Sequence, residues 1–188
     1  AKTVTHNLTV APEFMIVKAR GGSADWYCYH KDLGNNKDIR LDLSNASQSS
    51  TRWNNTSPTS SVFSVNANQD VNWSTINYVA YLFATCAGVS KVGSYTGTGT
   101  TAQINCGFTG GARFVMIKRT DDTGDWYVWD SARGIVAGND PYLLMNSTAA
   151  EVTNTDYVDT YASGFEISST APAGINANGG SYIYLAIA

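Results

Sequence analysis

Charged side chains are scarce in this sequence, and no part of it is rich in positive charge. Asp, Glu, Lys and Arg make up 14% of the 188 residues, whereas about 25% is usual in a soluble domain. The net charge is -3, and no run of Lys or Arg occurs. Because nucleic-acid binding needs a basic surface that neutralises phosphates, we expect no nucleic acid among the partners.

Long apolar runs and histidines are also missing. No apolar run approaches the roughly 18 residues that cross a bilayer, and no signal peptide is visible at the N-terminus, so we expect no membrane insertion. The only histidines are His6 and His30. Without His-Glu-x-x-His, paired Cys-x-x-Cys or an EF-hand loop, the sequence predicts neither a metal site nor a cofactor.

Catalytic motifs are absent as well. The sequence has no Gly-x-Ser-x-Gly elbow, and acids such as Glu13, Glu151 and Glu166 show no paired spacing. Glycoside hydrolysis needs two carboxyl groups roughly 5 to 9.5 Å apart. We therefore predict a protein that is not an enzyme. A small glycoside hydrolase remains a remote alternative, which a deep pocket joining two acids with raised pKa values would favour.

The sequence has only three cysteines, an odd number: Cys28, Cys86 and Cys106. The segment around Cys28 occurs a second time in the sequence, as described below, and there Val128 stands in place of Cys28. Cys28 is therefore interpreted as a small buried apolar residue. Whether Cys86 and Cys106 form a disulfide is left open, since neither spacing nor compartment requires it.

What the sequence does contain is one stretch that occurs twice. Residues 14–18 (Phe-Met-Ile-Val-Lys), a polar turn and residues 25–27 (Asp-Trp-Tyr) have counterparts at residues 114–118 (Phe-Val-Met-Ile-Lys) and 125–127 (Asp-Trp-Tyr), at an offset of 100. Such self-similarity is typical of two structural units of one kind. The units are predicted to be residues 1–88 and 89–188.

Short apolar or alternating segments separated by polar turns indicate strands, and no helical period is evident. The fold class predicted is therefore all-β, with two tandem, similar β-sandwich-like units. Residues 14–20 are nearly all apolar, which predicts a strand buried on both faces. Residues 77–84 and 181–188 are also apolar, and each is predicted to be a central strand.

The junction between the copies contains one further predicted strand, residues 89–95, ahead of a Thr-Gly-Thr-Gly-Thr link at residues 96–100. The first copy has no equivalent of this strand because the sequence begins too late. Either that strand was lost, or the chain is a piece of a longer protein; we favour the second explanation.

Two acidic residues and two lysines recur in the repeated stretch. Asp25 and Asp125 could contact a sugar or an ion, but we favour carboxylates that close the turn, either by accepting from backbone N–H groups or by pairing with Lys18 and Lys118.

Two tryptophans recur beside these acids. Trp26 and Trp126 are interpreted as core residues because both copies need them in one place. His30 has an aspartate, Asp130, as its counterpart, so we interpret it as a solvent-facing strand end and not as a shared base.

Function is instead sought where the copies differ. The candidate ligand-binding residues are aromatics in polar surroundings and one neighbouring amide: Trp53, Asn54, Trp73, Tyr157 and Tyr161. Such rings can stack on a sugar while their polar neighbours bond its hydroxyl groups. They can equally anchor a subunit interface, and the sequence does not decide between these two readings.

The repeated pattern also resembles a known kind of domain. Residues 12–18 with 25–27, residues 114–133 and residues 178–184 are similar to an uncharacterised tandem domain of tail-fibre-like and other virion-surface proteins of bacteriophages, marine ones especially. The most specific part is residues 118–127, Lys-Arg-Thr-Asp-Asp-Thr-Gly-Asp-Trp-Tyr. The first copy departs from the pattern at Ala19, Gly21 and Ala24.

The resemblance implies a non-enzymatic module on the virion surface, which binds host glycans or holds neighbouring subunits. The expected function is thus that of a virion structural or attachment module, with a capsid-decorating or cement protein as the alternative. Expected partners are other virion proteins, a host surface glycan, and further copies of the chain or other members of a larger assembly.

Overall fold

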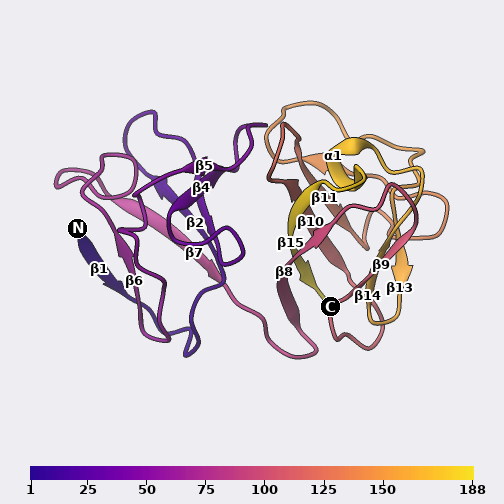
Figure 1. The fold of residues 1–188 in the computed structure, drawn as a ribbon, viewed down its shortest axis with the longest axis horizontal. Coiled ribbons are helices and arrows are strands. Elements are labelled where there is room, and N and C mark those ends of the chain that lie inside the picture. The colour runs from indigo at the N-terminus through magenta and orange to yellow at the C-terminus, as the bar shows by residue number, and fades with distance from the viewer. The chain divides into compact units, whose positions relative to one another are not determined.

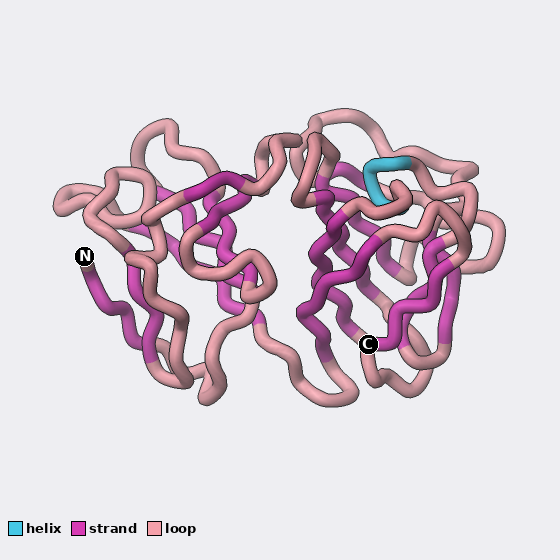
Figure 2. The backbone as a smooth tube through the Cα atoms, in the orientation of Figure 1, coloured by secondary structure: helices cyan, strands magenta, loops and turns pink.

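The structure is a computed structural model that describes all residues, 1–188, and it consists almost entirely of strands and loops (Figures 1 and 2). The chain forms two compact units. Unit 1 comprises Ala1–Leu43 and Ser47–Ala84, and unit 2 comprises Ser44–Ala46 and Thr85–Ala188. The all-β fold class is confirmed, and each unit is described separately below.

Unit 1 contains a five-stranded and a two-stranded sheet, both antiparallel. The five-stranded sheet has the order β5-β4-β3-β2-β7, and β1 pairs with β6 in the smaller sheet. The strands are β1 (Lys2–Thr5), β2 (Phe14–Ala19), β3 (Tyr27–His30), β4 (Lys37–Arg40), β5 (Gln48–Ser49), β6 (Val62–Val65) and β7 (Tyr78–Phe83).

The two sheets of unit 1 enclose one apolar core. Successive side chains of a strand point to opposite faces, so Met15 and Val17 of β2 face inward together with Tyr27 and Tyr29 of β3. From the smaller sheet, β6 adds Phe63 and Val65 to the same core; loop residues Trp53 and Val71 complete it. This is a sandwich in which one layer has only two strands.

Unit 2 has the larger sandwich. Its five-stranded sheet has the order β12-β11-β10-β15-β8, and its second sheet has three strands in the order β13-β14-β9. The elements are β8 (Ser90–Thr96), β9 (Ala102–Asn105), β10 (Phe114–Arg119), β11 (Trp126–Asp130), β12 (Leu143–Leu144), β13 (Val158–Tyr161), β14 (Gly164–Ile167), the helix α1 (Ala173–Asn176) and β15 (Ser181–Ile187). No helix is long or apolar enough to cross a membrane.

The central strands of the two units pair in the same register. Phe14 of β2 lies opposite His30 and Phe83, and Phe114 of β10 lies opposite Asp130 and Ile187. Consequently every residue of β7 has a matched position in β15, 104 residues further along the chain. These matched positions allow the two sandwiches to be compared residue by residue.

Two local predictions fail in unit 1. The strand predicted to be central, β7, lies at the edge of its sheet, whereas its match β15 is covered by β8. His30 is not a solvent-facing strand end: it is buried, its ring is 6.0 Å from that of Phe14, and its Nδ1 accepts from the N–H of Asp32 at 3.2 Å. The strand predicted over residues 14–20 is found as β2, Phe14–Ala19, in which five of the six residues are buried; Arg20 follows the strand and is exposed.

Candidate functional site

The free edge of β7 is the most distinctive feature of unit 1. The N–H of Arg20 bonds the carbonyl of Asn77, and because bonding alternates along an antiparallel pair, the backbone groups of Tyr78, Ala80 and Leu82 point away from β2. Their matches in β15 bond β8. In unit 1 the corresponding N–H and C=O groups meet no strand.

Beside this edge lies a hollow of about 340 Å³ with a lining that is partly apolar and partly polar, which we call the strand seat. It opens between β7 and the small sheet of β1 and β6. Its lining includes Lys2, Val4, Val17, Phe63, Val65, Val71, Asn72, Ile76, Asn77, Tyr78 and Ala80. Three of these residues, Lys2, Asn72 and Asn77, have charged or polar side chains; the others have aliphatic or aromatic side chains.

In unit 2 the matched place is filled by a strand. Tyr95 of β8 stacks on Tyr182 with ring centroids 4.9 Å apart, and its hydroxyl donates to the carbonyl of Ile175 at 2.7 Å. Burial raises the pKa of Tyr95 well above its ordinary value. The residues matched to Tyr182 and Ile175, namely Tyr78 and Val71, both line the strand seat.

Gly93 shows how closely β8 packs against β15. A Cβ on Gly93 would lie 2.6 Å from the hydroxyl oxygen of Tyr184, which is itself buried. The residue of β7 that matches Tyr184 is Ala80, whose side chain is short. A strand on β7 would therefore not need a glycine at this place.

A second, polar hollow of about 500 Å³ lies at a corner of unit 1. It is lined by Asn36, Ser49, Ser50, Thr51, Arg52, Asn55 and Asn68. Arg52 is fixed by three partners: its Nη1 lies 2.6 Å from Asp38, its Nη2 lies 2.7 Å from Asp70, and its guanidinium carbon lies 3.9 Å from the ring centre of Tyr27. These carboxylates raise the pKa of Arg52 against the opposite effect of its burial.

Trp53 does not form part of a sugar-stacking surface, and this part of the prediction is wrong. Its side chain is 0% exposed, its Nε1 donates to the carbonyl of Lys37 at 2.8 Å, and its ring packs edge-on against Tyr29. The chain reverses directly after it, at Asn54 and Asn55, which have φ angles of 54° and 47°. Asn tolerates this left-handed conformation, so the indole turns inward while Asn54 stays exposed.

The other aromatic candidates are dispersed. Trp73 of unit 1 is 51% exposed. In unit 2, Tyr157 is partly buried against Tyr142 with ring centroids 5.8 Å apart, and Tyr161 ends β13 opposite Gly164. No single unit contains an aromatic platform built from these residues.

The recurring lysines close their hairpin turns through backbone carbonyls. Lys18 Nζ donates to the carbonyl of Ala24 at 2.7 Å, and Lys118 Nζ donates to that of Gly124 at 2.6 Å. Lys118 also bonds the carbonyl of Ser44, in the short segment that belongs to unit 2. Burial lowers the pKa of Lys118 to about 8.

The recurring acids have partners other than these lysines. Asp25 pairs with Arg40 at 3.3 Å, and Asp125 accepts from the amide of Asn146 at 2.7 Å. Of the recurring tryptophans, Trp126 is buried, whereas Trp26 is only partly buried.

All three cysteines are free thiols, so Cys86 and Cys106 are not joined. Cys86 is exposed. Cys28 is fully buried, as its apolar counterpart Val128 indicated. Burial raises the pKa of Cys106 to about 11, which leaves it a weak nucleophile.

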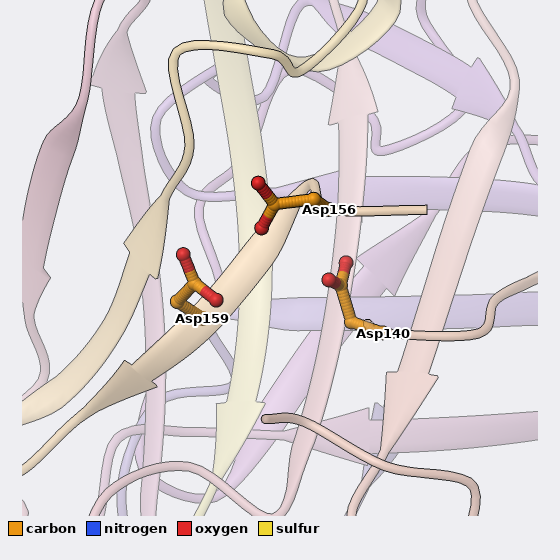
Figure 3. Close-up of side chains that lie close together, drawn as sticks. All are labelled: Asp140, Asp156 and Asp159. Carbon is orange, nitrogen blue, oxygen red and sulfur yellow. The ribbon is translucent and has the colours of Figure 1, made fainter. Parts of the chain in front are cut away.

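Three aspartates of unit 2 come together at one corner (Figure 3). One carboxylate oxygen from each of Asp140, Asp156 and Asp159 lies within 4.8 Å of the others. Burial raises the pKa of Asp140 to about 6 and also raises that of Asp159. Sequence reasoning missed this cluster, although the spacing of three between Asp156 and Asp159 was a signal; Asp140 is brought to them from a distant loop.

Comparison with protein families gives one match. A model of a domain of unknown function, DUF7483, matches residues 1–188, the full length of the chain. The chain belongs to the DUF7483 family. Comparison with curated proteins and with solved structures gives no match. The family assigns no activity, so the features that bear on function are the strand seat, the polar hollow and the corner formed by the three aspartates, which we call the acidic corner.

Proposed function

We propose that the chain is a non-enzymatic structural module of a larger assembly and that β7 accepts an extended strand from a neighbouring chain. One observation carries the proposal: β7 has an open edge beside the strand seat, whereas in unit 2 the matched edge is paired with β8. The chain thus contains its own template for the missing strand.

The template specifies the chemistry of the incoming strand. It runs antiparallel to β7, exchanges backbone hydrogen bonds with Tyr78, Ala80 and Leu82, and places an aromatic side chain over Tyr78, as Tyr95 lies over Tyr182. Strand addition of this kind obtains affinity from backbone bonds and specificity from the pockets that receive alternate side chains.

The composition of β7 supports covering of its edge. Free edge strands in stable monomers usually carry charges or prolines, which prevent unwanted pairing. Residues 78–83, Tyr-Val-Ala-Tyr-Leu-Phe, contain neither, and Tyr81 is 47% exposed. An apolar edge without these protections suits a strand that is paired in the working assembly.

The assembly that we propose is the surface of a bacteriophage virion, with other virion proteins as the neighbours. Support for this context comes from the resemblance of residues 118–127 and their first copy to a virion-surface domain. A capsid-decorating or cement role uses the same strand seat and differs only in which chain supplies the strand.

The acids do not support the hydrolase alternative. Asp140 and Asp159 lie close together and have raised pKa values, but Asp140 is 0% exposed and its Oδ2 already accepts from two backbone N–H groups. A glycosidic bond could not reach this carboxyl group.

A labelled peptide of residues 89–97 tests strand acceptance by fluorescence anisotropy with the full chain. We expect saturable binding, and at least tenfold weaker binding when the tyrosine of the peptide is replaced by serine. Ala80→Pro removes an outward N–H group at an edge position that tolerates proline, so it should abolish binding, while Ala80→Ser should bind like the wild type. Equal binding by both variants, or none at millimolar peptide, would refute the proposal.

Carbohydrate binding is a second candidate, favoured by the amides and hydroxyls around the polar hollow of unit 1. A glycan array tests it. Binding that is lost in Asn55→Ala and kept in Trp73→Ala would assign the sugar to this hollow; the reverse pattern would assign it to the exposed indole of Trp73. An array without any signal leaves the structural role alone.

A further inference from the structure

The acidic corner of unit 2 is formed by two segments of the chain. Asp140 precedes β12, and Asp156 and Asp159 lie on either side of the start of β13. Figure 3 shows the three carboxyl groups directed into one common space. Their nearest oxygens lie within 4.8 Å of one another, although like charges at that separation repel.

Only one of the two carboxylate oxygens of Asp140 forms hydrogen bonds within the protein. Its Oδ2 accepts from the N–H groups of Tyr157 at 2.8 Å and Val158 at 2.7 Å. Its Oδ1 is buried and has no hydrogen-bond partner, in a residue that is 0% exposed. A buried carboxylate oxygen without a partner is costly, so this atom points to a ligand that the protein itself does not supply.

The neighbouring groups do not compensate the charge. None of the three aspartates forms an ion pair with Lys, Arg or His. The hydrogen bonds that their carboxylates accept from the protein come from backbone N–H groups, including that of Gly138 to Asp159 at 3.3 Å. Three carboxylates thus face one space that contains no cationic side chain.

We propose that Asp140, Asp156 and Asp159 bind one Ca²⁺ ion. Carboxylate oxygens are the preferred ligands of hard cations, and Ca²⁺ takes six to eight oxygens at about 2.3–2.6 Å. Oxygens on opposite sides of such an ion are separated by roughly 4.6–5.2 Å, which accommodates the separations at this corner. Water and nearby backbone carbonyls complete the shell. Zinc is disfavoured because neither His nor Cys is present.

Unit 1 has the same corner without the charge. The carbonyls of Arg52 and Tyr157 accept from Asn66 and Ser168, the residues that follow β6 and β14, so these two loops correspond. With Arg52 matched to Tyr157, Thr51 corresponds to Asp156 and Asn54 corresponds to Asp159. Arg40 lies opposite Tyr27, and Leu144 lies opposite the matched Tyr127, so Arg40 corresponds to Leu144. Four residues earlier in each chain segment, Asn36 therefore corresponds to Asp140.

Neutral side chains therefore occupy all three matched positions in unit 1. The proposal consequently specifies one ion per chain, in unit 2 alone.

Calorimetric titration of the full chain with Ca²⁺, together with luminescence of Tb³⁺ sensitised by Tyr157, which follows Asp156 in the chain, tests the site. We expect one Ca²⁺ per chain and a rise of Tm with Ca²⁺ concentration, since a ligand that binds only the folded state stabilises it. Asp156→Asn and Asp159→Asn, which keep the size of each side chain, should each weaken binding at least tenfold. Asp122→Asn, at an exposed acid elsewhere in unit 2, serves as the matched control.

Asp140→Asn gives unit 2 the residue that unit 1 has at this place. If this variant fails to fold, the other two still decide the outcome, because their carboxyl groups are more exposed and circular dichroism monitors their fold. The proposal is overturned if the chain binds no Ca²⁺ at millimolar concentration, if it binds two ions, or if Asp156→Asn and Asp159→Asn bind as tightly as Asp122→Asn.

Discussion

The strands β7 and β15 occupy the same place in their sandwiches, but only one of them is covered. On β15, the strand β8 pairs along seven residues and buries Tyr95 against Tyr182. On β7 the matched backbone groups are open, and a hollow of about 340 Å³ remains where the tyrosine would lie. This difference is the basis of our proposal that unit 1 receives a strand, and β8 indicates which features that strand would need.

Removing the cover from unit 2 should have the largest effect. We expect Tyr95→Ala to lower the free energy of unfolding by about 2–4 kcal/mol, because it removes a stacked ring and leaves a cavity. Ser94→Ala, on the exposed side of β8, should change it by less than about 0.5 kcal/mol. Urea denaturation measures both, and equal effects would show that β8 is not a cover of the core.

The lysines of the two turns should also differ. Lys118→Met leaves two carbonyl acceptors without their donor, those of Gly124 and Ser44, whereas Lys18→Met leaves only that of Ala24. An acceptor left unsatisfied in the interior costs about 1–3 kcal/mol. Thermal unfolding should therefore show a larger loss for Lys118→Met; a larger loss for Lys18→Met would contradict the assigned bonds.

A glycine-to-alanine change at position 93 should have different effects on a strand paired with β15 and on a strand paired with β7. Gly93→Ala in the chain should destabilise unit 2 by about 1–3 kcal/mol, the usual cost of overpacking, because the new Cβ meets the ring of Tyr184. The same glycine-to-alanine change in the peptide of residues 89–97 should leave its affinity for the chain unchanged within about threefold, since Ala80 stands opposite. Loss of peptide binding would show that the template does not transfer to unit 1.

A pH dependence is also expected from Lys118. Its pKa in the folded chain is about 8, lowered by burial from 10.5, so the folded state releases the proton first as pH rises. Its contribution to stability is therefore fully present above pH 10.5 and is lost as pH falls through about 8. The difference in stability between wild type and Lys118→Met should grow from pH 7 to pH 10; a constant difference would contradict the lowered pKa.

The sequence predicted the sheet cores well and the free surfaces poorly. The apolar pattern of residues 14–19 indicated burial, and the fold class followed from it. The same pattern misplaced β7, because an apolar run does not show whether a strand has one neighbour in its sheet or two. Trp53 was misassigned because a polar loop does not reveal which side chain turns inward; the left-handed conformation of Asn54 and Asn55 does so here.

The acidic corner was beyond sequence reasoning for a different reason. The carboxylate of Asp140 accepts from the N–H groups of Tyr157 and Val158, and this contact joins two segments that lie apart in the sequence. Sequence spacing could pair Asp156 with Asp159, but it could not add the third carboxyl group.

Amide hydrogen exchange of β7 tests strand acceptance most directly. The N–H groups of Tyr78, Ala80 and Leu82 should exchange quickly in the free chain, while those of Tyr182, Tyr184 and Ala186 are protected by β8. At saturating concentrations of the peptide of residues 89–97, the first three should become protected to a similar degree. Protection already present in the free monomer, or no change when the peptide is bound, would contradict the central claim that β7 receives a strand.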